Sequence, residues 1–180
     1  MQKKSRLYGW MTAPAPSVSR LQRQWLTHPG ALTQGLRTLG VLTLRVLSEK
    51  VCRASLDEAT RLGLPTGHAL WQREVCMAIS GVDCVMAHSV TPLEAAHGYW
   101  QAVRRLRNRP LADILYHDPT IVRSDFEFTN IRLANFPTRV CARRSVFVRA
   151  RQPLLVAEAF LPVFWSIALG AKSRSSRASL

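Results

Sequence analysis

Two apolar segments in the middle of the chain, separated by a tight turn, constrain the fold most strongly. Residues 71–80 (WQREVCMAIS) and 84–90 (CVMAHSV) both alternate with the two-residue period of a β-strand. Gly81-Val82 between them has a glycine in the first position of a two-residue loop, which is typical of a type II′ hairpin. Because a hairpin joins antiparallel strands, the sequence indicates an antiparallel sheet.

Further strand and helix patterns are distributed so that runs of strands alternate with blocks of helices. Strands are expected over residues 41–54, 124–131, 143–150 and 154–161. Helices are expected over residues 18–27, 31–40 and 91–106, from Ser55, and from Pro110. This order predicts an α+β fold with a single six-stranded antiparallel sheet.

The length of 180 residues suits one domain. We expect residues 1–17, which contain Pro14 and Pro16, to be a flexible arm, and residues 18–165 to be the domain. The Ser-rich, basic residues 166–180 are expected to form a disordered tail.

The charge of the chain is strongly positive, with 25 Lys and Arg against 11 Asp and Glu and a net charge of +14. Such an excess favours an anionic partner, or it reflects solvated surface charge. We find no nucleic-acid-binding motif, and the most apolar stretch, 154–169, contains Glu158 and Pro162. The basic N-terminus lacks the apolar core of a signal peptide. We therefore expect a cytoplasmic protein without membrane insertion or nucleic-acid binding.

Arg73 occupies an unusual position on its predicted strand. Alternation places it on the same face as Trp71, Val75, Met77 and Ile79, whose size marks this face as the inner one. A guanidinium group stays charged, and burying it without a partner costs several kcal/mol, on the order of 3–5. Arg73 must therefore contact a carboxylate or another anion, either from the protein or from a ligand.

Glu158 is enclosed in a similar way, because both faces of the segment 154–161 (LLVAEAFL) are apolar. An enclosed carboxylate either pairs with a cation or keeps its proton. Two interpretations are open. Arg73 and Glu158 form one buried ion pair, or they line a cavity in which Arg73 binds a ligand carboxylate and Glu158 accepts a hydrogen bond from a ligand hydroxyl.

Two more residues are candidates for the same site. A helix beginning at Pro110 would present the amide of Leu111 to an anion. In the register of a Gly81-Val82 turn, His88 lies opposite Val75 on the inner face, where it would help to hold a second ligand carboxylate. The alternatives are an ordinary core leucine and a satisfied interior histidine.

Four segments, in this order, resemble the bacterial chorismate pyruvate-lyase family. They are residues 25–40 (WLTHPGALTQGLRTLG), 71–92 (WQREVCMAISGVDCVMAHSVTP), 110–128 (PLADILYHDPTIVRSDFEF) and 143–162 (RRSVFVRARQPLLVAEAFLP). The resemblance implies removal of pyruvate from chorismate to give 4-hydroxybenzoate for ubiquinone synthesis, with no metal or organic cofactor. It also implies a monomer with helices on one side of the sheet and helical flaps over a buried ligand.

The resemblance assigns roles to individual residues. The arginine that binds the carboxylate falls on Arg73, and the glutamate near the product hydroxyl falls on Glu158. The backbone amide that also contacts the carboxylate falls on Leu111, and a contact from a flap falls near Leu32. The main alternative is a non-catalytic, effector-type domain of the same fold that binds a small carboxylate.

Overall fold

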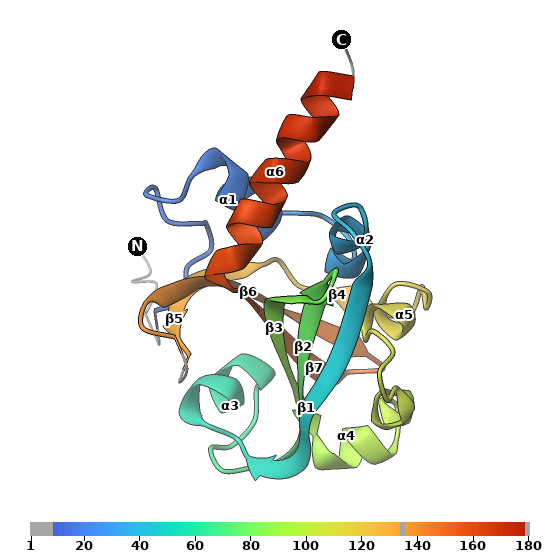
Figure 1. Ribbon diagram of the computed structural model, residues 1–180. Coiled ribbons are helices and arrows are strands. Elements are labelled where there is room, and N and C mark those ends of the chain that lie inside the picture. Colours follow the sequence, from blue (N-terminus) through green and yellow to red (C-terminus); the bar gives the residue numbers. More distant parts are fainter. Residues whose placement is uncertain (1–8, 134–135, 179–180) are drawn as a thin grey trace.

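An antiparallel sheet runs through the computed structural model, which describes residues 9–133 and 136–178 (Figure 1). Within these residues the sheet has seven strands in the order β1-β2-β3-β7-β6-β4, and β5 also pairs with β6. The strands are β1 (Leu42–Arg53), β2 (Ala69–Ile79), β3 (Val82–Pro92), β4 (Val122–Arg123), β5 (Glu127–Arg132), β6 (Arg139–Arg149) and β7 (Gln152–Phe160). The predicted fold class is confirmed. The predicted count of six strands is wrong because β4 has two residues, too few to show a period.

The β2–β3 hairpin turns one residue earlier than the sequence predicts. Ser80 and Gly81 both have positive φ, 49° and 84°, as a type I′ turn requires. A β-bulge opposite Met77 and Ala78 then adds one residue, Cys84, to β3. The two differences leave a net shift of one residue in the pairing of β2 with β3, which exchanges the two faces of β3 relative to the prediction.

The β6–β7 hairpin sets the other half of the sheet. Ala150 and Arg151 form its two-residue loop, with φ of 47° and 65°. The register from this loop places Arg143 of β6 directly opposite Glu158 of β7. These two side chains therefore share one face of the sheet.

Helices cover both faces of the sheet unequally. They are α1 (Arg20–Leu26), α2 (Leu32–Arg37), α3 (Leu56–Leu62), α4 (Leu93–His97), α5 (Ala112–Leu115) and α6 (Pro162–Ala178), with a short 3-10 helix η1 (Gln101–Arg105). The predicted helix over 91–106 is divided at Gly98 into α4 and η1. The predicted capping box of Ser55 and Glu58 begins α3.

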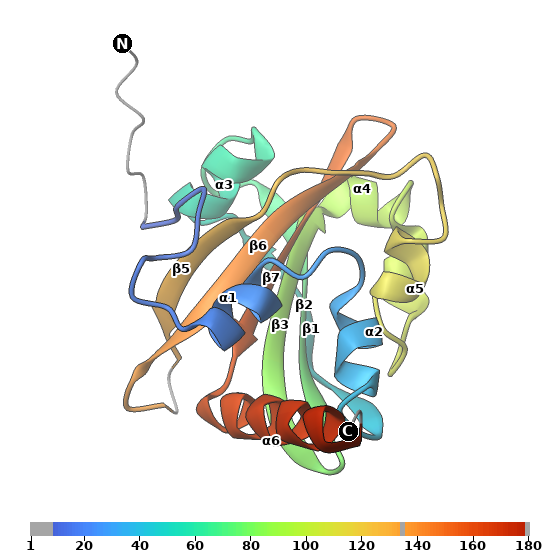
Figure 2. The same ribbon diagram turned by 90° about the horizontal axis from the view of Figure 1, so that it is seen from above.

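One face, here called the pocket face, is covered by all of these helices except α3. Buried residues of α1, α2 and α6 pack there with Met77, Val85 and Phe160, and residues of α4, η1 and α5 pack with Phe147 and Leu154. Figure 2 looks onto this face, with α1 and α2 in front of the strands.

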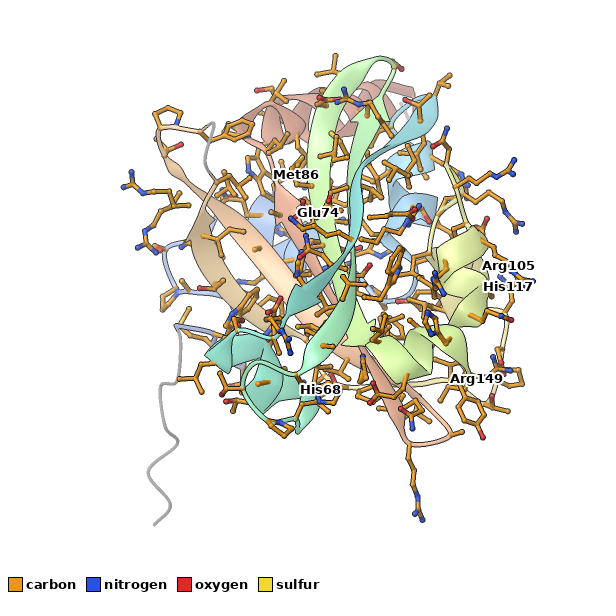
Figure 3. The ribbon with its side chains drawn as sticks, turned by 90° about the horizontal axis from the view of Figure 1, so that it is seen from below. His68, Glu74, Met86, Arg105, His117 and Arg149 are labelled. Atoms are coloured by element: carbon orange, nitrogen blue, oxygen red, sulfur yellow. The ribbon has the colours of Figure 1, made fainter. Side chains whose placement is uncertain are left out.

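The opposite face, here called the α3 face, carries α3 against Leu70, Val90 and Leu155. Figure 3 looks onto it, with α3 in front and Glu74 and Met86 on the strands. The expectation of helices on one side therefore fails for α3. Its inner residues Ala59 and Leu62 bury apolar surface that would otherwise be exposed.

The two ends of the domain differ from the sequence prediction. Residues 166–178, expected to be disordered, belong to α6, because Phe164 and Ala168 pack into the core and anchor the helix. In the expected N-terminal arm, the backbone of Met11 exchanges two hydrogen bonds of 2.8 Å with Phe128 of β5. Residues 1–8 and 179–180 lie outside the described residues. None of the helices in the described part of the chain combines the length and the apolar composition needed to span a bilayer.

Candidate active site

A pocket lies on the pocket face, between the strands and the short helices above them. Its charged residues are Arg73, Arg143 and Glu158. Its walls are mainly apolar, and on the strand side they include Leu44, Val75, Met77, Phe147 and Val156. On the helix side they include Leu32 and Thr33 of α2 and the segment 110–112, Leu115 and Tyr116 around α5. The pocket combines apolar walls with few polar groups, as is typical of small-molecule sites.

Arg73 enters the pocket from β2 and is 2% exposed. Its Nε donates to Oε1 of Glu49 at 3.0 Å, and Nη2 donates to the carbonyl oxygens of Arg107 at 2.6 Å and Arg109 at 3.3 Å. Burial lowers the pKa of Arg73, and the carboxylate of Glu49 opposes this change. The guanidinium remains a cation, and its Nη1 has no acceptor among the described residues.

Leu111 lies beside Arg73, because the two carbonyls that hold Arg73 belong to the loop before α5. This four-residue helix begins at Ala112 rather than at Pro110, and Leu111 is its N-cap. Its first backbone bond runs from Asp113 N–H to Pro110 O. In the described part of the chain the amide of Leu111 donates to no acceptor, and Leu111 lines the pocket.

Glu158 enters the pocket from β7 on the same face as Val156, as the alternation predicts. Its Oε2 accepts a hydrogen bond of 2.6 Å from Nε of Arg143. Arg73 has Glu49 as its carboxylate partner instead. The interpretation in which Arg73 and Glu158 form one ion pair is therefore wrong, and both residues line the same pocket.

Arg143 is a pocket residue that the sequence analysis missed. It is 1% exposed, and its Nη1 donates to the carbonyl oxygens of Trp25, Leu26 and His28 at 3.3, 3.3 and 3.0 Å. Its Cζ lies 4.4 Å from the ring centroid of Phe126. The sequence does contain a pattern that predicts an inward Arg143, because alternation from Ser145 and Phe147 puts Arg143 on the inner face. The β6–β7 hairpin then puts it opposite Glu158.

Two short helices form the cover of the pocket. Leu32, the predicted flap contact, is the first residue of α2, is buried and lines the pocket. The phenol O–H of Tyr116, at the end of α5, donates to the carbonyl oxygen of Gly30 at 2.9 Å. This hydrogen bond joins the end of α5 to the loop between α1 and α2.

His88 does not line this pocket. The shifted register pairs it with Glu74 and places it on the α3 face, so its predicted position on the inner face is wrong. Its ring nitrogens lie 3.0 Å from Oε1 of Glu58 and 3.4 Å from Oε1 of Glu74. The hydrogen bond from His88, with further bonds from Ser55, lowers the pKa of Glu58 to about 2 despite burial. In the described residues, no group of three or more His, Cys, Asp or Glu side chains is placed to hold a metal ion.

Fold and pocket together define an α+β domain with a pocket whose charged residues are two buried arginines and one glutamate. Solved structures of similar fold include the effector domain of PhnF from Mycobacterium smegmatis, at 13% identity and a TM-score of 0.54, covering 74% of this chain and 89% of that one. A GntR-family transcriptional regulator from Bacillus cereus is 14% identical with a TM-score of 0.50, covering 67% and 92%. At such identities the likeness shows the fold alone.

The chain belongs to the chorismate lyase family, whose sequence model matches residues 8–169. A probable chorismate pyruvate-lyase of Bordetella pertussis is 49% identical over 174 residues, covering 89% of this chain and 92% of that protein. Proteins with closely similar names are 50% identical in Bordetella avium, covering 87% and 85%, and 36% identical in Burkholderia pseudomallei, covering 88% and 92%.

Proposed function

We propose that this protein is a chorismate pyruvate-lyase, which converts chorismate into 4-hydroxybenzoate and pyruvate. The main support is membership of the chorismate lyase family, together with an enclosed pocket that contains Arg73 and Glu158. We also propose that the product serves ubiquinone synthesis in the cytoplasm. The protein acts as a monomer in this proposal.

Arg73 binds the ring carboxylate of chorismate in this proposal. Its Nη1 donor has no acceptor among the described residues, and the amide of Leu111 lies beside it. A carboxylate can accept from both groups. The bonds from Arg73 to Glu49 and to the loop carbonyls hold the guanidinium in place before the substrate arrives, which reduces the entropy cost of binding.

Glu158 contacts the C4 hydroxyl of the substrate, which becomes the phenol of the product. During the reaction the C3–O bond breaks and its electron pair leaves with the enolpyruvate. The C4 proton is lost, the ring becomes aromatic, and the enolpyruvate takes up a proton to become pyruvate. Because aromatisation drives this elimination, the protein mainly has to orient a dianion and exclude water.

Conversion of chorismate by the purified protein tests the proposal. We expect 4-hydroxybenzoate and pyruvate in equal amounts, measured by absorbance and by a lactate dehydrogenase assay. Arg73→Gln should lower kcat/KM by about a hundredfold or more, because it removes a charged partner of a buried carboxylate.

The second candidate function is a binding domain without catalysis, because the effector domain of PhnF shows that this fold also occurs in a transcriptional regulator's effector domain. That candidate predicts binding of chorismate without release of pyruvate, an outcome that would overturn the assignment as a lyase. A domain of this kind should still lose the ligand in Arg73→Gln.

A further inference from the structure

Chorismate carries two carboxylates, and the proposed function uses Arg73 for only one of them. We propose that Arg143 binds the second carboxylate, the one on the enolpyruvyl group. This inference rests on the proposed function and extends it to the specificity of the site for a dianion.

The donors of Arg143 leave one nitrogen for a ligand. Nε donates to Glu158, and Nη1 donates to the three carbonyl oxygens at the end of α1. Nη2 has no acceptor among the described residues. It is absent from the fully buried atoms that lack a partner, so part of its surface is accessible. A donor that is unpaired and yet not sealed off, on a residue that lines the pocket, is available to a carboxylate in the pocket.

The structure of chorismate brings its second carboxylate to this nitrogen. The enolpyruvyl ether is attached to C3, and the hydroxyl that Glu158 contacts is attached to C4, the neighbouring ring atom. Arg143 Nε is 2.6 Å from the Glu158 carboxylate, so the group beside that hydroxyl also lies beside Arg143. The ring carboxylate on C1 extends away from this end, toward Arg73.

The charges around Arg143 favour a second anion. Glu49 balances Arg73 and Glu158 balances Arg143, so these pairs alone give no net positive charge. Arg123 adds a cation at the Arg143 end, because its Cζ lies 4.0 Å from the ring centroid of Phe126, the ring that Arg143 also contacts. The Nη1 of Arg123 is buried and has no partner among the described residues.

Tyr116 provides independent evidence that these charges share one neighbourhood. Burial is the main cause of the raised pKa of its phenol, and the charges of Arg123, Glu158 and Arg143 all act on it as well. Tyr116 itself lines the pocket. The end of the pocket that holds Glu158 therefore has Arg143 in its wall and Arg123 behind Phe126, and these two arginines near one glutamate give a net positive charge suited to a carboxylate.

Two unreactive ligands that differ by one carboxylate test the inference. They are 3-(carboxymethoxy)-4-hydroxybenzoate and 3-methoxy-4-hydroxybenzoate, whose dissociation constants can be measured by calorimetry. Arg143→Gln should weaken binding of the dicarboxylate about tenfold more than binding of the methoxy compound. A factor of about ten corresponds to the loss of one hydrogen bond between charged groups. Arg143→Lys keeps the positive charge and should restore part of this difference. Arg73→Gln, the matched control, should weaken both ligands by the same factor.

The outcomes separate this role of Arg143 from a structural one. If Arg143 acts only by holding Glu158 and the end of α1, Arg143→Gln weakens both ligands equally, and the inference is overturned. If Arg143→Gln fails to fold, Arg143→Lys carries the test, and an unchanged ratio of the two affinities then overturns the inference. Binding is measured without turnover, so a failure of the wild type to release pyruvate from chorismate counts against the proposed function and leaves this test intact.

Discussion

Arg143 and Arg144 are neighbours on β6 and project to opposite faces of the sheet. Both are buried, with 1% and 5% of their surface exposed. On the α3 face, Arg144 donates to Oδ2 of Asp57 at 2.6 Å and to Oε2 of Glu127 at 2.7 Å, and its Cζ lies 4.2 Å from the ring centroid of Trp10. On the pocket face, Arg143 has Glu158 and backbone carbonyls, and its Nη2 is left for a ligand.

The contrast shows that burial does not distinguish a structural arginine from a ligand-binding one. The acceptors that the protein supplies make the distinction. Two carboxylates already surround Arg144, and Arg61 donates to the same Glu127 at 2.9 Å, so this network is balanced without a ligand. Arg73 and Arg143 have only one carboxylate partner each, Glu49 and Glu158, and both line a cavity.

The largest effect is expected from Arg144→Gln. This change leaves Asp57 and Glu127 without their shared cation, so the free energy of unfolding should fall by about 3–5 kcal/mol. Urea denaturation measures the change. Arg45→Gln is the matched control, because the ion pair of Arg45 with Asp83 is exposed and should contribute at most about 1 kcal/mol. Equal losses in the two variants would contradict a structural role for Arg144.

A smaller effect, on turnover rather than stability, is expected from Glu158→Gln. The amide can still accept from Arg143, so the free energy of unfolding should fall by only about 1–2 kcal/mol. Loss of the carboxylate beside the reacting ring should lower kcat about a hundredfold. Steady-state kinetics and urea denaturation of the same preparation give both values. A normal kcat per folded molecule would show that Glu158 belongs with Arg144 among the structural charges.

The smallest effect is expected from Glu58→Gln on the α3 face, and it depends on pH. The pKa of Glu58 in the folded protein, about 2, is below its value in the unfolded chain, so the unfolded chain binds more protons. The carboxylate therefore stabilises the fold fully above about pH 4.3, and this contribution is lost as the pH falls toward 2.

Thermal denaturation of wild type and Glu58→Gln should accordingly show a difference of about 2 kcal/mol at pH 6 that shrinks by pH 3. Glu94→Gln is the control, because the carboxylate of Glu94 also contacts a histidine, His68, but is 62% exposed. A difference for Glu58→Gln that is the same at both pH values would mean that its side chain stabilises α3 without its charge.

Much of the sheet could be predicted from alternation and turns, because both depend on neighbouring residues. The strand face of Arg73 follows from the size of the side chains beside it. The enclosure of Glu158 follows from the apolar residues on both faces of its strand, and the structure has both residues in the pocket. The position of His88 could not be predicted in the same way. It depends on a bulge opposite Met77 and Ala78, which no local sequence pattern predicts. The one extra residue exchanges the two faces of β3.

The partners of the pocket charges needed pairing between distant segments. The inward position of Arg143 was within reach of prediction, since the alternation of β6 from Ser145 and Phe147 gives it, whereas its place opposite Glu158 depends on the two-residue loop Ala150-Arg151. Glu49 was not, because the pairing of β1 with β2 contains another irregularity between Val46 and Ser48. The helical tail was missed because its anchors, Phe164 and Ala168, gain their stabilisation from tertiary packing rather than from helix propensity.

The hydrogen bond from Tyr116 to Gly30 bears on how molecules pass between the pocket and water. A single neutral bond of this kind contributes about 1 kcal/mol, which favours the joined arrangement of the two cover segments by roughly fivefold. Separating them at this point requires no change in the pairing of the strands. Exchange of ligand can therefore occur by movement of the cover while the sheet stays intact.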